Sequence, residues 1–252
     1  MSKYPVLKHI NKEFRRNCSK VESYKYLYEP DVKCEILGSG NLSVLVVGNS
    51  YAYNHFDGIV YALKGRFSLA RLYAINVQQK CGRLVNTTRD LILNTKPDLI
   101  FVISKHQPLM KMPLYTNGTD ACIESLREFF DFASTNATAV FYPDPQIEFD
   151  YFVTYEMAKK IWMRAPLNVM NKRYETHLQE TKNIYERLKQ INCTNCFMFN
   201  WSGVHCQTGL CQAYEEELEL PLFRDYDHVN RIGVAKLFNE TKKTIDKALN
   251  FV

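Results

Sequence analysis

The sequence predicts a three-layer α/β/α sandwich built on a central parallel sheet of about five strands. Several short, uninterrupted apolar runs end abruptly at turn residues, which is typical of strands buried on both faces of a parallel sheet. These runs alternate along the chain with helical patterns, and such alternation places crossover helices on both faces of the sheet. The 252 residues are 46% hydrophobic and 23% charged, so the chain can bury the sizeable core that this fold needs.

Residues 1–40 carry many charges and little periodicity, and we interpret them as an N-terminal extension. They contain Cys18 and Cys34, and a disulfide could tie the extension to the core. Gly38 and Gly40 stand in a turn cluster just before the first apolar run. Residues 41–252 show no internal repeat and no linker, so we predict that they form one domain.

The run from Val44 to Val47 predicts the central strand, because it is apolar throughout and stops at Gly48. A helix over residues 54–64 follows it. The other predicted strands are 69–77, 98–104, 138–142 and 196–200, and the other predicted helices are 87–95, 120–133, 151–162, 173–188 and 229–249. We expect a loop over 108–118, which holds two prolines. We expect two aromatic pairs to lie in the core, Phe129-Phe130 and Tyr151-Phe152.

The charge pattern argues against nucleic-acid binding, and the hydropathy pattern argues against a membrane span. The net charge is +5, but Lys and Arg are scattered, with no basic run beyond Lys242-Lys243, so we expect no nucleic-acid binding. No apolar stretch approaches the ~18 residues of a membrane span. The start of the chain also has no hydrophobic signal core.

Cysteines and glycosylation sequons nevertheless indicate a secretory compartment. The chain has eight cysteines, and its density of Asn-x-Ser/Thr sequons exceeds chance. We therefore expect the chain to be the extracellular or secretory-lumen part of a longer membrane protein. The alternative is a cytosolic protein that is rich in Asn and Thr. The sequons are at Asn17, Asn41, Asn86, Asn117, Asn136, Asn192, Asn200 and Asn239.

Ser50 is the candidate nucleophile. It follows the predicted central strand, at the carboxyl edge where open α/β sheets bind their ligands. Backbone N–H groups at the start of the next helix would favour a negative charge that develops beside it. In the alternative interpretation, Asn49 or Ser50 only caps that helix.

His228 and Asp225 are the candidate base and its partner. A serine nucleophile needs a base to take its proton, and the base needs a group that holds its tautomer. The two residues are three apart, on a loop that follows the last strand and therefore reaches the same edge as Ser50. Among the alternatives, His55 lies on the nucleophile's own helix, and Asp227, adjacent to His228, less easily reaches its ring. We interpret His106 and His205 as plain loop histidines.

The order Gly-Asn-Ser after the first strand and Asp-x-x-His before the last helix resembles the SGNH (GDSL-type) hydrolase superfamily. The chain is most similar to the SGNH domain of nematode acyltransferase family 3 membrane proteins, over about residues 40 to 249. The resemblance is carried by residues 44–51, 81–102 and 225–233 and by the cysteine pair Cys206 and Cys211, which in that family commonly precedes the Asp-x-x-His block.

The resemblance implies that Ser50 is the nucleophile, His228 the base and Asp225 its orienting partner. Asn49 replaces the family's usual Asp, and its amide can still form the hydrogen bonds of the turn. The family's oxyanion-hole Gly and Asn blocks are hard to place. As oxyanion donors we therefore predict Ser50 together with Gly65 and Lys105, where Lys105 or alternatively a backbone N–H takes the place of a missing Gly-x-Asn block.

The implied function is an O-acyl (acetyl) transferase or esterase that acts through this serine on a carbohydrate or lipid-like hydroxyl. The implied partners are an acylated small molecule or glycan and a membrane-embedded acyltransferase domain of the same parent chain. The alternative is a catalytically weak or inactive lumenal accessory domain that keeps only the fold.

The last four cysteines allow more than one interpretation. Cys193 and Cys196, with Cys206 and Cys211, have a spacing that could bind zinc, and Cys193-x-x-Cys196 could also be a redox pair. In a lumenal protein we instead expect disulfides, in particular Cys206–Cys211, which would hold the loop that follows. We expect no metal and no cofactor.

Overall fold

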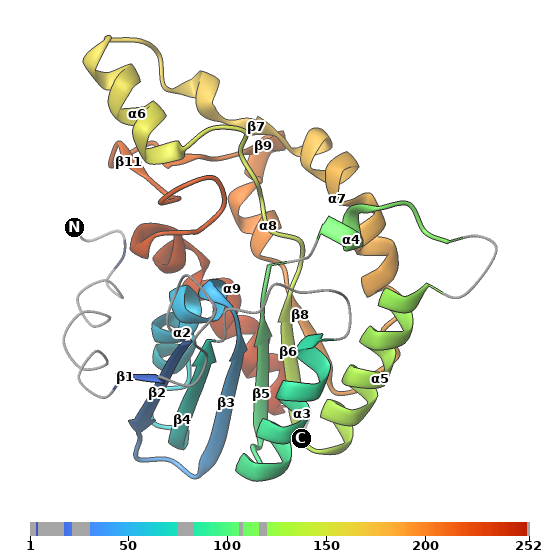
Figure 1. Ribbon diagram of the computed structural model, residues 1–252. Helices are drawn as coiled ribbons and strands as arrows, with labels where there is room; N and C mark the ends of the chain where they lie inside the picture. Colours follow the sequence, from blue (N-terminus) through green and yellow to red (C-terminus); the bar gives the residue numbers. More distant parts are fainter. Residues whose placement is uncertain are drawn as a thin grey trace.

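The computed structural model describes residues 4, 18–21, 31–74, 83–105, 108–115 and 120–250. Within them lies a seven-stranded sheet in the order β1-β2-β4-β3-β5-β6-β8 (Figure 1). Five of these strands, β4, β3, β5, β6 and β8, are parallel, which confirms the predicted fold class. The strands span Cys18–Val21 (β1), Asp31–Leu37 (β2), Leu42–Gly48 (β3), Phe67–Ala74 (β4), Leu99–Ile103 (β5), Ala139–Pro143 (β6) and Cys196–Phe199 (β8).

The sheet continues into the predicted N-terminal extension. β2 pairs antiparallel with β4, and β1 pairs antiparallel with β2. The antiparallel edge has a different sequence pattern from the parallel centre, because Lys33 and Glu35 alternate with the buried Cys34 and Ile36. The boundary near residue 40 stays a prediction.

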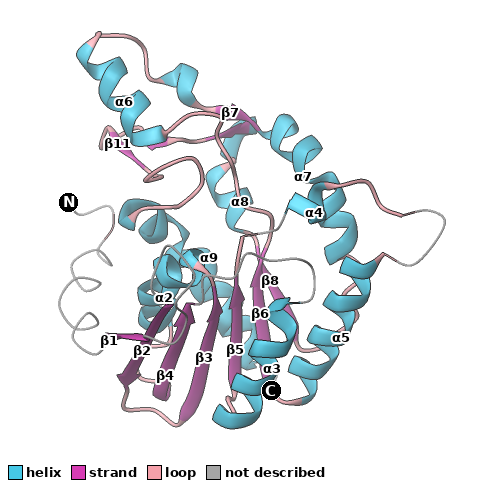
Figure 2. Cartoon of the chain, in the orientation of Figure 1, coloured by secondary structure: helices cyan, strands magenta, loops and turns pink. Residues whose placement is uncertain are grey.

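Strand β3 lies at the centre of the sheet, between β4 and β5, as predicted. Its successive side chains point to opposite faces. Val44 and Val46 pack in one cluster with residues of α2 and α9, whereas Leu45 and Val47 pack in another with residues of α3 and α5. These two clusters are the cores of the two helix-covered faces, which Figure 2 shows as cyan helices on either side of the magenta sheet.

The helices include five long ones and three short ones within the described residues. The long helices are Ser50–Ala62 (α2), Arg83–Thr95 (α3), Ala121–Thr135 (α5), Tyr174–Leu188 (α7) and Arg231–Asn250 (α9). The short helices are Pro108–Lys111 (α4), Val153–Trp162 (α6) and Trp201–His205 (α8). None of the helices described is long and apolar enough to cross a bilayer.

Two expectations about local structure are wrong. The predicted loop over 108–118 begins with the helical turn α4, because a proline is well suited to the first position of a helix. Phe152 is 42% exposed rather than buried, because it stands at the N-cap of α6, outside the core; Phe129 and Phe130 are buried as predicted.

A smaller layer covers the carboxyl edge of the sheet. It contains two-stranded sheets, Lys172–Arg173 (β7) with Leu210–Cys211 (β9) and Tyr214–Glu215 (β10) with Leu220–Pro221 (β11), and two 3-10 turns at Asn168–Met170 and Gln207–Gly209. Its own apolar cluster includes Ile147, Phe149 and Phe223. In Figure 1, α6 stands at the top of the molecule, farthest from the sheet.

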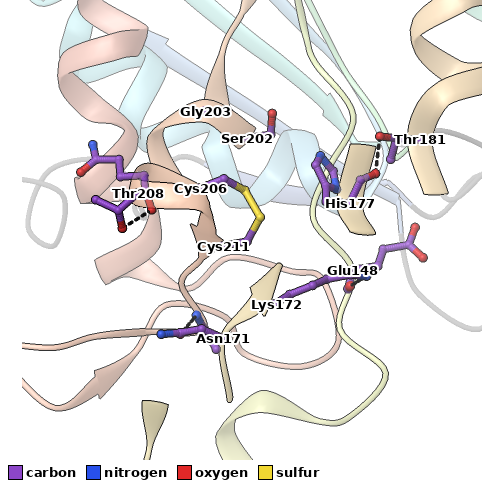
Figure 3. Close-up of a disulfide and its surroundings, with 12 residues drawn as sticks. Glu148, Asn171, Lys172, His177, Thr181, Ser202, Gly203, Cys206, Thr208 and Cys211 are labelled. Atoms are coloured by element: carbon purple, nitrogen blue, oxygen red, sulfur yellow. Dashed lines mark hydrogen bonds between the residues drawn. A yellow bond between two sulfur atoms is a disulfide. The ribbon is translucent and has the colours of Figure 1, made fainter. Parts of the chain in front are cut away.

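Cys206 and Cys211 form the predicted disulfide, which joins the end of α8 to β9 (Figure 3). Cys193 and Cys196 form a second one. The zinc alternative for these four cysteines is therefore wrong, because their sulfurs are bonded in pairs. Cys34 and Cys122 are disulfide-bonded as well.

Candidate functional site

A tight turn at the end of β3 places Ser50 at the carboxyl edge of the sheet. Gly48 has a φ of +156°, and a Cβ there would lie 1.8 Å from the carbonyl oxygen of Ile103, so only glycine fits. Asn49 is the N-cap of α2, and its side chain accepts a hydrogen bond from the backbone N–H of Tyr51 at 3.1 Å. Asn49 therefore makes the turn hydrogen bond that we expected of it, and the Ser50 hydroxyl is not needed as the cap.

Ser50, His228 and Asp225 lie together, as their spacing and order led us to expect. The Ser50 Oγ is 2.8 Å from His228 Nε2, and His228 Nδ1 is 3.0 Å from Asp225 Oδ1. With Nδ1 donating to the carboxylate, Nε2 is free of a proton and faces the hydroxyl. This arrangement can abstract the Ser50 proton. Catalysis by the three residues stays a prediction.

The candidate catalytic loop, residues 224–229, is held in its shape by Asp225. Its Oδ1 also accepts hydrogen bonds from the backbone N–H groups of Asp227 at 3.1 Å and His228 at 2.9 Å. The same oxygen thus fixes both the backbone and the ring of His228. Tyr51 packs against the other side of the site, with its ring centroid 4.6 Å from that of His228.

Asp227 reaches the histidine ring, and our expectation that it would not is wrong. Its Oδ1 makes an ion-pair contact with His228 Nδ1 at 3.0 Å, the same distance as Asp225. The backbone N–H groups of Asp227 and His228 both turn toward the Asp225 carboxylate, and the loop in this shape brings the Asp227 carboxylate to His228 Nδ1. Asp227 Oδ2 pairs in addition with the ammonium of Lys105, which follows β5.

Lys105 lies beside the site, but its ammonium is engaged in ion pairs. Besides Asp227, it lies 3.4 Å from Glu148 Oε1, and Lys111 approaches the other Glu148 oxygen at 2.7 Å. A role of Lys105 as an oxyanion donor stays a prediction. Our reasoning from the sequence missed Glu148, because a single glutamate in a loop between β6 and α6 belongs to no motif.

Gly65 is wrong as an oxyanion donor. It lies in the turn between α2 and β4, at the amino edge of the sheet. The 13 residues of α2 separate it from Ser50 by about 20 Å. Ser50 itself is the first residue of α2, so its backbone N–H is one of the helix's unpaired donors.

The charges around His228 favour its protonated form. Burial lowers the pKa of His228, but Asp227 and Asp225 outweigh burial, and its pKa is raised above the ordinary value. Burial opposes ionisation of Asp225 too, but the backbone N–H groups of His228 and Asp227 lower its pKa. The pKa of Asp227 is lowered further, against burial, by His228 and Lys105. Both carboxylates are therefore ionised at neutral pH and stabilise the imidazolium that forms when Ser50 loses its proton.

Two other described histidines, His55 and His205, do not compete for this role. His55 is buried and stacks on Trp201 at 4.0 Å, and burial lowers its pKa to about 3. His205 was expected in a loop, but it ends α8 and is buried against Phe223, with a pKa that burial lowers to about 3. His106 lies outside the described residues.

Asp225, Asp227 and His228 also form a group that could hold a metal ion, since their ligand atoms lie within 4.8 Å of one another. The Lys105 ammonium already pairs with one of these carboxylates, and His228 Nε2 faces Ser50. This pairing suits proton transfer better than metal binding.

Two comparisons with known proteins, a family match and one solved structure, agree with the fold. The family described as "SGNH domain (fused to AT3 domains)" matches residues 17–243. The periplasmic domain of a Salmonella ser. Paratyphi A lipopolysaccharide acetyltransferase has a similar structure, with a TM-score of 0.57 and 14% identity over 83% of this chain and 85% of that one. The C-terminal catalytic domain of Streptococcus pneumoniae peptidoglycan O-acetyltransferase A gives a TM-score of 0.39 and 13% identity over 86% of this chain and 95% of that one. No curated protein matches this sequence.

Proposed function

Because the chain belongs to the family of SGNH domains that are fused to AT3 domains, we propose that it is a serine-dependent O-acyltransferase or esterase. The observation that carries this proposal is the hydrogen-bonded row of Ser50 Oγ, His228 Nε2, His228 Nδ1 and Asp225 Oδ1. Acetyl is the acyl group we propose, because the structural relative with the same fold is named as an acetyltransferase. The acceptor is a carbohydrate or lipid-like hydroxyl.

The reaction proceeds in two steps. His228 Nε2 takes the proton of Ser50 Oγ while that oxygen bonds to the acyl carbon. The bond between the acyl carbon and the leaving oxygen then breaks, and that oxygen receives the proton from His228 and departs as a hydroxyl. The acyl group stays on Ser50. In the second step His228 takes a proton from the acceptor hydroxyl or from water, whose oxygen displaces Ser50, and the serine recovers its proton.

We propose an extracellular or lumenal location for this chemistry, on the outer side of a membrane that carries an AT3 domain. The sequons support it, because five of their asparagines are exposed: Asn41, Asn136, Asn192, Asn200 and Asn239. The AT3 domain would supply the acyl group, and this chain would pass it to the acceptor.

A fluorophosphonate probe tests the proposal, because only an activated serine reacts with it. We expect one label, on the peptide that contains Ser50, and no label after Ser50→Ala. Ser134→Ala is the matched control, since Ser134 lies at the end of α5 and its hydroxyl donates only to a backbone carbonyl. Full labelling of the Ser50→Ala variant would contradict the proposal.

One observation favours the alternative, a catalytically weak or inactive accessory domain. Of the three predicted oxyanion donors, Gly65 is remote and Lys105 is held in ion pairs. Loss of one oxyanion donor costs roughly 3 kcal/mol of transition-state stabilisation. A folded protein that takes up no probe would support this alternative.

A further inference from the structure

The C-terminal end of α6 presents three consecutive exposed apolar residues, which we call the α6 tip. Ile161 is 54% exposed, Trp162 84% and Met163 57%. Figure 1 shows α6 at the top of the molecule, on the far side of the small strands from the main sheet. Tyr155 and Val169, at 70% and 62% exposure, add apolar surface to the same protrusion. Water-exposed apolar clusters of this kind mark interaction sites.

We propose that the α6 tip is a membrane-docking surface that inserts into the headgroup region of a phospholipid bilayer. Tryptophan is suited to this position, because its ring is apolar and its N–H is polar. The cationic residues Lys159, Lys160 and Arg164 adjoin the tip in the sequence and can reach lipid phosphates while their stems remain in the apolar layer.

Carboxylates near the α6 tip limit the contribution of positive charge to lipid binding. Glu156 contacts Lys160 at 3.3 Å and Lys159 at 3.8 Å. Glu216 and Glu219 line the groove that Ile161 and Arg164 also line. These carboxylates offset much of the positive charge. Insertion of the tip therefore supplies most of the attraction, and anionic lipid adds a smaller part.

Lipid fits the tip better than a protein partner does. Three side chains at the end of one helix form a small projection, whereas stable protein interfaces bury on the order of 1,200–2,000 Å² in total. A bilayer accepts a small projection without a matching surface. The family also places the chain beside a membrane, because its members are fused to AT3 domains, which we expect to be membrane-embedded.

Helix α6 connects the tip to the catalytic loop. The backbone N–H of Val153 donates to the carbonyl of Asp225 at 3.3 Å, and the hydroxyl of Thr154 donates to the carbonyl of Arg224 at 2.7 Å. The Phe152 ring packs edge-on against Tyr226, with centroids 5.5 Å apart. The ten residues of α6 span about 15 Å, so docking would hold the His228 loop at a short, fixed distance from the bilayer.

Tryptophan fluorescence tests the proposal, because the chain has two tryptophans and only Trp162 is exposed; Trp201 is 5% exposed. The full chain is titrated with vesicles of phosphatidylcholine, and with vesicles that contain one-fifth phosphatidylserine. We expect a blue shift of the emission, quenching by lipids brominated near the headgroup end of the acyl chain, and somewhat tighter binding to the anionic vesicles.

Co-sedimentation with the same vesicles compares the binding of two variants with that of the unaltered chain. Trp162→Ala should weaken binding about tenfold or more, because the buried ring contributes most of the apolar area. Leu37→Ala is the matched control, since Leu37 is 79% exposed at the end of β2, and it should bind like the unaltered chain.

Any of three results would overturn the docking proposal: an emission that does not change in saturating lipid, equal losses of vesicle binding in the two variants, or a dimer that Trp162→Ala dissociates. Probe labelling of Ser50 without vesicles is measured on the same preparations. If the unaltered chain is labelled at Ser50 but does not bind vesicles, only the docking proposal is contradicted. If it binds vesicles but is not labelled, only the proposed function is contradicted.

Discussion

At the scale of single residues, His228 has two carboxylates on one nitrogen. Asp225 accepts the hydrogen bond and fixes the loop backbone, whereas Asp227 adds a second negative charge that Lys105 partly balances. The two aspartates therefore have separable effects. Loss of Asp225 removes the group that holds the tautomer, and loss of Asp227 changes mainly the basicity of the ring.

The pH dependence of ester hydrolysis should reveal this difference. His228 must be neutral to accept the Ser50 proton, and its pKa is raised, so kcat/KM should rise with pH through a value above the ordinary 6.5. Asp227→Asn removes a group that raises this pKa, so the rise should move to lower pH. Asp225→Asn should instead lower the rate by orders of magnitude.

Glu180→Gln is the control for these profiles, because Glu180 is an exposed carboxylate on α7 that pairs with Lys172 rather than with the catalytic loop. Its profile should match that of the unaltered protein. An Asp227→Asn profile that rises at the same pH as the unaltered one would show that Asp227 does not act on His228.

At the scale of elements, strands were predictable where they are buried on both faces. β3, β5 and β6 are apolar runs with no exposed residue, and each was expected near its observed position. β2 was missed, because an edge strand with Lys33 and Glu35 has no such run. The Lys105–Asp227 pair could not be predicted either, because 122 residues separate its members and only the fold brings them together.

Gly65 shows the corresponding limit for the site. It was proposed for the family's Gly block without a motif around it, and the length of α2 carries it to the opposite edge of the sheet. The Ser50, His228 and Asp225 positions were predictable, because each follows from the end of a strand or the start of a helix. Oxyanion donors that are backbone N–H groups, or side chains distant from Ser50 in the sequence, have no comparable sequence pattern.

The Cys206–Cys211 disulfide allows a test of whether the smaller layer at the carboxyl edge of the sheet supports the site. It closes a short loop, so its loss should cost less than the ~3 kcal/mol of a fifteen-residue loop. We expect Cys206→Ser/Cys211→Ser to lower the free energy of unfolding by about 1–2 kcal/mol in urea melts and to reduce probe labelling of Ser50.

The other short disulfide provides the comparison. Cys193→Ser/Cys196→Ser removes a link just before β8, at the amino edge of the sheet, away from Ser50. Its effect on labelling should be small. If the two double variants lost labelling equally, the Cys206–Cys211 bond would have no special relation to the site.

At the scale of the whole molecule, Ser50 and the α6 tip lie toward the same end of the described part of the chain. The carboxyl edge of the sheet holds Ser50, the smaller layer covers that edge, and α6 projects beyond it (Figure 1). Three exposed sequon asparagines lie elsewhere: Asn41 and Asn136 precede β3 and β6 at the amino edge of the sheet, and Asn239 is on α9. Glycans at these three positions would leave the edge that holds Ser50 open, whereas Asn200 follows β8 at that edge.

Glycosylation can be measured directly. We expect the chain, secreted from a eukaryotic cell, to lose mass on treatment with an N-glycosidase, with occupied sites among Asn41, Asn136, Asn192, Asn200 and Asn239. Asn136→Gln and Asn239→Gln should each remove one glycan. The exposed Asn168, which lies in no sequon, serves as the control. A secreted protein with no glycan would contradict the lumenal assignment.

We propose that Ser50, His228 and Asp225 act as one unit, and the kinetics of combined variants can show whether they do. Hydrolysis of an activated acetyl ester is measured for Ser50→Ala, His228→Ala and the double variant. Residues that act together lose activity non-additively, so each single variant should fall to nearly the level of the double variant. Losses that multiply, or a Ser50→Ala variant that keeps its activity, would contradict the account.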